Sequence, residues 1–150
     1  MTTSQPVVPG TIVLTSSGVQ VLSPPPDATD IVDAGQPVQL RLNLSVTGLP
    51  AIVAMYANEP VQIKHHLELI ETGARKTLGP FNFVTPAPAG LASFSFTTGP
   101  FTSGLGVGDF QTAPGDDDGT YRVITEFHFV AAGARANSVF DDRIVVVTAP

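Results

Sequence analysis

Two stretches of the chain, residues 61–71 and 119–130, carry its densest group of side chains able to bind a metal ion or a charged partner. Both alternate between apolar and polar residues, as a half-buried β-strand does. If the two strands are neighbours in one sheet, their polar positions share its outer face. The candidate binding residues on that face are Lys64, His66, Glu68, Arg122, Glu126 and His128.

Two kinds of chemistry are open to this face. Imidazole nitrogens and carboxylate oxygens are the usual non-thiolate ligands of Zn²⁺ and other divalent metals, so a metal site would use His66, Glu68, Glu126 and His128. The alternative, which we favour, is a ladder of cross-strand charge pairs that joins Lys64 to Glu126 and Arg122 to Glu68. Either interpretation requires the two strands to be adjacent, because a slip of one residue would disperse the cluster.

A second oxygen-rich segment is Asp116-Asp117-Asp118, in a loop flanked by glycines. Carboxylates are Ca²⁺ ligands, but the run lacks the spacing of an EF-hand loop, and we favour a solvated turn. The histidine on the apolar side of the 61–71 stretch, His65, is expected to be a buried or edge histidine that is satisfied by a hydrogen bond. The sequence contains no cysteine and no Gly-x-Ser-x-Gly motif, so it offers no candidate for nucleophilic catalysis. We therefore predict no catalytic residues, no enzyme activity and no cofactor.

The charge and hydrophobicity of the chain limit the classes of partner that it is expected to bind. The 150 residues are 43% hydrophobic and only 13% charged, with a net charge of −6. Nucleic acid is not expected as a partner, because phosphate neutralisation needs clustered cations. No apolar run approaches the ~20 residues that span a bilayer, and the first residues lack the pattern of a secretory signal, so we expect a cytoplasmic protein without a membrane span. Two explanations of the low charge density are open: uncharged polar residues (Thr, Ser, Gln and Asn) occupy solvent-facing strand positions, or a neighbouring subunit covers part of an apolar surface.

The chain reads as an all-β protein. An extended arm is expected at residues 1–10 and a single domain at 11–150. Strands are predicted at 11–21, with a bulge or turn at Ser16-Ser17-Gly18, and at 38–46, 61–71, 75–83, around Phe94 and Phe96, at 119–130 and at 139–148. Residues 51–56 are expected to form a short strand or a buried crossing segment, and residues 144–147 to be buried on both faces. Residues 99–118 are expected to be irregular.

These elements favour an antiparallel β-sandwich of two sheets and seven to nine strands. A jelly roll or a small β-barrel is the alternative. No internal repeat is expected.

One local motif carries a resemblance to a known family. Asp117, Gly119 and Tyr121 stand in the order Asp-x-Gly-x-Tyr at the start of an alternating strand. This resembles the tyrosine corner of immunoglobulin-like domains, in which the tyrosine hydroxyl reaches back to the backbone near the start of strand F. The resemblance implies that residues 61–71, 120–130 and 139–148 correspond to strands C, F and G of one sheet. By analogy it also implies a role in binding or assembly.

We therefore expect a non-enzymatic protein–protein interaction module, or a self-assembling structural subunit, whose partner is a second copy or a larger assembly. Its means would be apolar surface, open sheet edges and the 1–10 arm. The alternative function is a small metal-binding protein or metal-dependent enzyme built on the His/Glu cluster.

Overall fold

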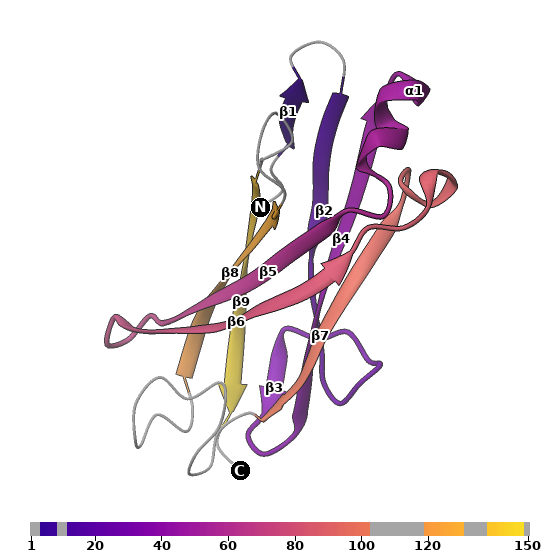
Figure 1. The fold of residues 1–150 in the computed structure, drawn as a ribbon. Coiled ribbons are helices and arrows are strands. Elements are labelled where there is room, and N and C mark those ends of the chain that lie inside the picture. Colours follow the sequence, from indigo (N-terminus) through magenta and orange to yellow (C-terminus); the bar gives the residue numbers. More distant parts are fainter. Residues whose placement is uncertain (1–3, 9–11, 103–118, 131–137, 149–150) are drawn as a thin grey trace.

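In a computed structural model the protein is a sandwich of two β-sheets, described for residues 4–8, 12–102, 119–130 and 138–148 (Figure 1). One sheet has the strand order β1-β2-β4-β7 and the other β3-β9-β8-β5-β6. The strands are β1 (Ser4–Val8), β2 (Ile12–Leu22), β3 (Ile31–Asp33), β4 (Pro37–Gly48), β5 (Pro60–Leu69), β6 (Ala74–Val84), β7 (Phe94–Thr102), β8 (Gly119–Phe129) and β9 (Ser138–Thr148). The predicted all-β, two-sheet architecture is confirmed, and neither sheet closes into a barrel.

The pairing of β5 with β8 confirms that residues 61–71 and 119–130 are neighbours. The two strands are antiparallel, with Lys64 opposite Glu126 and Glu68 opposite Arg122. β9 lies on the other side of β8, so the three strands expected in one sheet are together. The pair of β3 with β9 is parallel, which departs from the purely antiparallel expectation. β3 is only three residues long, too short to show a periodicity in the sequence.

The core lies between the sheets and follows the alternation of the strands. In β4, the alternate residues from Val38 to Val46 are at most 3% exposed, and in β8 the same holds from Tyr121 to Phe129. Val61, Ile63, His65, Leu67 and Leu69 form the buried side of β5. Each fully buried aliphatic or aromatic side chain contributes about 1.5–3 kcal/mol relative to its exposed state. The apolar faces read from the sequence are therefore the two inner faces of the sandwich.

Two local predictions were wrong. Residues 51–56 are helical, as α1 (Pro50–Val53) and the 3-10 turn η1 (Ala54–Tyr56), rather than extended. Pro50 occupies the first turn of α1, where its missing N–H costs nothing, and a short apolar run does not by itself distinguish helix from strand. The 144–147 run is not buried on both faces, since Ile144 and Val146 are 46% and 37% exposed. They lie on the outer face of β9, while Val145 and Val147 point into the core.

The N-terminal strands β1 and β2 bear on two further predictions. The bulge predicted at Ser16–Gly18 is confirmed, because the register of β2 with β4 shifts between Ser16 and Gly18. Part of the expected 1–10 arm, β1, pairs antiparallel with β2 as an edge strand of the same chain's sheet.

The stretch 99–118, expected to be irregular, begins inside a strand, because β7 extends to Thr102. Residues 103–118 lie outside the described residues. A 3-10 turn, η2 (Pro88–Gly90), precedes β7. Among the described residues no helix is long and apolar enough to cross a membrane.

The edge strands β6 and β7 share a feature that the expectation of no internal repeat missed. Residues 77–81 read Thr-Leu-Gly-Pro-Phe and residues 97–101 read Thr-Thr-Gly-Pro-Phe. At both places the ladder to the neighbouring strand changes register, and the glycine has a positive φ, 104° at Gly79 and 103° at Gly99. The two bulges therefore have the same sequence and the same backbone conformation at corresponding edges of the two sheets.

We predict that Gly99→Ala destabilises the protein much more than Gly73→Ala. Both glycines have left-handed backbones, which cost an alanine about 1–2 kcal/mol. A Cβ on Gly99 would also lie 2.8 Å from the carbonyl oxygen of Val38, whereas one on Gly73 would meet nothing within 4 Å. Overpacking should add roughly 1–3 kcal/mol at Gly99. Equal losses in urea-induced unfolding of the two variants would contradict this account of the bulge.

Candidate functional site

The outer face of the five-stranded sheet brings the six predicted binding residues together. The register of β5 with β8 places Gln62, Lys64, His66 and Glu68 in successive rows opposite His128, Glu126, Ile124 and Arg122. β6 continues two of these rows, with Thr77 opposite His66 and Arg75 opposite Glu68. Arg75 and Thr77 thus join the face, although they are not among the binding residues predicted from the sequence.

The charges on this face pair differently from the predicted ladder. The expected partners are opposite in the backbone register, but Glu126 Oε2 lies 3.1 Å from His66 Nε2 on the diagonal. Glu68 Oε2 accepts a hydrogen bond of 2.9 Å from Arg75 Nε on β6. Long side chains reach diagonal and next-strand neighbours as easily as direct partners, so register alone does not fix ion pairs. Exposed pairs of this kind contribute little to stability, typically about 0–1 kcal/mol.

The metal-site hypothesis receives no support from this geometry and stays a prediction. Glu126 lies between two imidazoles, but His128 Nδ1 is 3.7 Å from Glu126 Oε1, beyond hydrogen-bond distance. Glu68 is held by Arg75 instead. Within the described ranges, no group of three or more His, Asp or Glu side chains is arranged to hold a metal ion.

A depression of about 350 Å³ lies on this face, over the end of the sheet where β5 turns into β6. Arg75, Lys76 and Arg122 line it together with His66 and Glu68, and Ile124 contributes apolar surface. In Figure 1 the turn between β5 and β6 projects away from the other strands. The depression thus combines both signs of charge on a part of the sheet that stands out from the fold.

An apolar strip borders the charged residues on the same sheet. Ile31 on β3 is the register partner of Val146 on β9, and Ile144 is the partner of Arg122. Ile31, Ile144 and Val146 are 61%, 46% and 37% exposed. The face therefore passes from exposed aliphatic side chains on β3 and β9 to charged side chains on β8, β5 and β6.

The predicted tyrosine corner is described only in part. Tyr121 is fully buried, and Gly119 has a φ of 142°, with Leu69 so close that a Cβ would collide with it. Thr120 N–H donates to both carboxylate oxygens of Glu71, at 2.9 and 3.2 Å. Hydrogen bonds from the backbone N–H groups of Glu71 itself and of Thr120 hold the pKa of that carboxyl below its usual value. Asp117, with Asp116 and Asp118, lies outside the described residues, so the corner and the cation-binding loop stay predictions.

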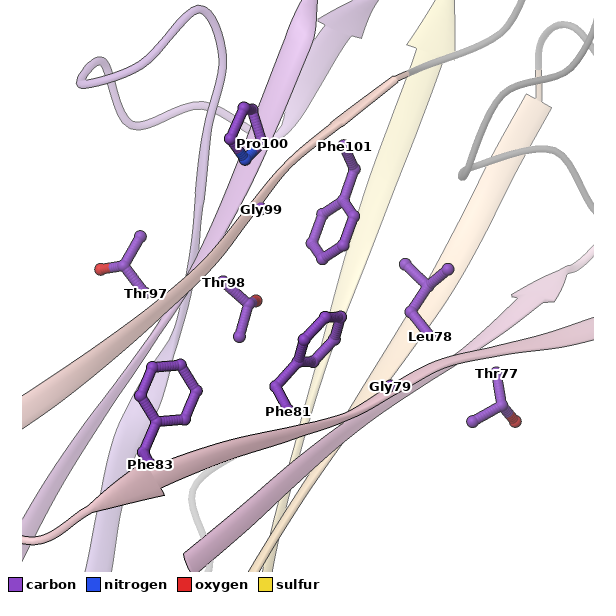
Figure 2. Close-up of a pocket in the computed structure, with 10 residues that line it drawn as sticks. All are labelled: Thr77, Leu78, Gly79, Phe81, Phe83, Thr97, Thr98, Gly99, Pro100 and Phe101. Carbon is purple, nitrogen blue, oxygen red and sulfur yellow. The ribbon is translucent and has the colours of Figure 1, made fainter.

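A groove of about 550 Å³ lies between the edge strands β6 and β7 and was not expected from the sequence. Figure 2 shows Phe81, Phe83, Phe101 and Leu78 in the space between the two strands. The rings of Phe81 and Phe101 are 5.6 Å apart, so residues from both sheets meet across the open side of the sandwich. The signal that could have revealed this groove was the repeated Thr-x-Gly-Pro-Phe.

His65 is buried beside this groove and is satisfied, as predicted. Its ring lies 5.9 Å from that of Phe81 and 6.1 Å from that of Phe101. Nδ1 is 2.8 Å from Thr125 Oγ1 on its own sheet, and Nε2 is 2.7 Å from Thr98 Oγ1 on the other sheet. His65 therefore links the two sheets by hydrogen bonds.

The hydrogen-bond network assigns the tautomer of His65. Thr98 Oγ1 donates its proton to the carbonyl oxygen of Leu40, at 3.3 Å, so it accepts from the histidine. Nε2 then carries the hydrogen, and Nδ1 accepts one from Thr125. Burial, with a smaller contribution from the neighbouring His66, lowers the pKa of His65 from 6.5 to about 4. The neutral imidazole is thus the form that the folded protein stabilises.

Comparison with known proteins assigns no family. No protein-family model matches the sequence, and no curated protein matches it. Among solved structures, superoxide reductase (neelaredoxin) from Ignicoccus hospitalis is similar over 89% of this chain and 82% of that chain, with 13% sequence identity and a TM-score of 0.38. A TM-score this low supports no inference about function.

We predict that His65 makes the protein sensitive to acid. The pKa of His65 is 6.5 in the unfolded chain and about 4 in the folded protein, so between these values the unfolded chain binds more protons. The contribution of His65 to the free energy of unfolding should be fully present above pH 6.5. It should fall by about 1.4 kcal/mol per pH unit towards pH 4, a loss of about 3 kcal/mol in all. Urea unfolding of His65→Gln should lack this component, whereas His66→Gln should retain it. Parallel pH profiles for wild type and His65→Gln would show the prediction to be wrong.

Proposed function

We propose that this chain is a non-enzymatic protein-interaction module that binds a second copy of itself through the outer face of the five-stranded sheet. The observation that carries the proposal is the exposed strip of Ile31, Ile144 and Val146 beside charged residues of both signs. Protein interfaces combine an apolar centre with a polar rim in which arginine is enriched. A contiguous exposed apolar patch on a soluble domain is a marker of such a contact.

The mixed charge of the face suits a symmetric pair. Lys64, Arg75 and Arg122 stand beside Glu68 and Glu126 in adjoining rows of the sheet. In a two-fold dimer the same patch meets itself, so cations of one copy can lie against carboxylates of the other. A surface of one sign only would repel its copy.

The edges of the sheets favour contact through a face over addition of a strand. The edge strands are β1 and β7 in one sheet and β3 and β6 in the other. Pro6, Pro100 and Pro80 remove backbone donors from β1, β7 and β6, and β3 has only three residues. Prolines, bulges and short strands at edges discourage pairing with another chain. We therefore set aside the strand addition suggested by the sequence as the mode of assembly.

An immunoglobulin-like fold is part of this proposal. β8 lies between β5 and β9, as strand F of that fold lies between C and G, and these three strands share a sheet. The opposite sheet contains β4 and β7 next to each other. The fold itself implies no particular partner, so the argument for self-association rests on the surface of the sheet.

We predict that Val146→Glu weakens self-association by at least about tenfold, whereas Val13→Glu leaves it unchanged. Both valines are 37% exposed on outer strand faces, but Val13 belongs to the other sheet. A carboxylate buried without a partner at the centre of an interface costs at least about 1.4 kcal/mol, which is tenfold in affinity. Sedimentation velocity over a range of concentrations measures the effect. A wild-type protein that stays monomeric at high concentration would overturn the proposal.

The charged part of the interface gives a second prediction. Arg122→Glu should weaken the dimer, since it removes a cation and places a carboxylate opposite Glu68. The double variant Arg122→Glu with Glu68→Arg restores both charges in exchanged positions and should recover much of the association. Recovery that is insensitive to salt, or no recovery with both variants folded, would argue against electrostatic pairing across the face.

A further inference from the structure

The groove between β6 and β7 is a second surface feature, remote in the strand order from the apolar strip on β3 and β9. β6 and β3 are opposite edges of the five-stranded sheet. The groove volume of about 550 Å³ falls in the range of ligand pockets, about 300–1,000 Å³. Its residues come from both sheets, so it lies where the sandwich is open at the side.

The lining of the groove defines the chemistry of a ligand. Three phenylalanines, Phe81, Phe83 and Phe101, supply aromatic surface, and none of the described residues that line the groove carries an ionisable side chain. A charged ligand would lose its hydration without gaining a partner of opposite charge. A flat aromatic molecule can instead pack against phenylalanine rings in offset or edge-to-face arrangements. Thr77 Oγ1 lies 3.1 Å from His66 Nδ1 and Thr97 Oγ1 accepts a hydrogen bond of 3.5 Å from Arg41 Nε, so the backbone at the bulges is left to meet a polar group of the ligand.

The repeated motif contributes one glycine to each wall of the groove. Gly79 and Gly99 lie on its two walls, and a Cβ on either would come within 3 Å of a backbone carbonyl oxygen, that of Ile63 or Val38. The walls at these points therefore consist of backbone without side chains. Between them, His65 contacts Phe81 and Phe101 from the core and hydrogen-bonds to Thr98, which fixes the floor.

We propose that this groove binds a small, uncharged aromatic molecule. Its ring packs on Phe83 and the Phe81–Phe101 pair, and its polar group reaches the backbone at the bulges. The groove and the apolar strip on β3 and β9 lie at opposite edges of the five-stranded sheet, so this binding does not require the self-association proposed above, although Thr77 borders both the groove and the charged part of the face.

Indole is a suitable probe, since it is flat, uncharged and has one hydrogen-bond donor. The chain contains no tryptophan, so indole fluorescence is observed without a tryptophan background from the protein. In ¹H–¹⁵N correlation spectra, indole should cause saturable shifts of the Gly79 and Gly99 amides. Indole-3-acetate, which carries a negative charge, should bind more weakly at the same site. Shifts that are absent or do not saturate, or that occur only on the outer face of β9, would overturn the proposal.

Matched variants test the aromatic wall. Phe83→Leu removes a ring from the groove, and Phe94→Leu removes a half-buried ring outside its lining. Loss of ring packing should weaken indole binding by roughly two- to tenfold in Phe83→Leu only. An equal effect in both variants would mean a general loosening of the fold, which overturns a specific groove site. Val146→Glu should bind indole like wild type, so failure of the dimer proposal and failure of this one are distinguishable.

Discussion

The pairing of β5 with β8 is the constraint on which the rest of this structure depends. The register is uninterrupted from the Val61–Phe129 pair to the Leu69–Tyr121 pair. Because side chains alternate across a strand, a slip of one residue would turn His66 and Glu68 inward and Ile63 and Leu67 outward. The burial of the apolar set on both strands makes such a slip very costly. The composition of the outer face is thus fixed by the packing of the inner one.

The repeated Thr-x-Gly-Pro-Phe segments have two structural consequences. Pro80 and Pro100 remove hydrogen-bond donors from edge strands, which discourages pairing with a further strand. The same bulges direct Phe81 and Phe101 towards each other across the open side of the sandwich, beside the buried His65. The same type of bulge, present once in each sheet, therefore both discourages pairing of the edge strand and positions the phenylalanines of the groove.

Most of the Lys and Arg residues of the chain lie on neighbouring strands of one sheet. Lys64, Arg75, Lys76 and Arg122, four of the seven Lys and Arg residues, belong to β5, β6 and β8. Exposed Ile and Val side chains occupy the neighbouring β3 and β9. Charge and apolar surface are thus placed next to each other on one sheet, which is the arrangement that the proposed interface uses. His65 is a polar group inside the core, and its two threonine partners make its burial tolerable.

The sequence by itself determined which residues of each long strand face the core, because alternation is a local property with a period of two. Val38 to Val46 and Tyr121 to Phe129 are read correctly on that basis, as is the burial of His65. The tyrosine-corner resemblance pointed to β5 and β8 as neighbours, but only the tertiary structure fixed their register. It also decided that Glu126 meets His66, that Glu68 meets Arg75, and that β3 joins β9. The Glu126–His66 and β3–β9 contacts join residues far apart in the sequence, and Glu68 is directly opposite both Arg75 and Arg122, so no local periodicity encodes which partner it takes. The groove could not be predicted from the sequence for a similar reason. Its two walls, on β6 and β7, have similar sequences, but they form one site only when the two sheets pack together.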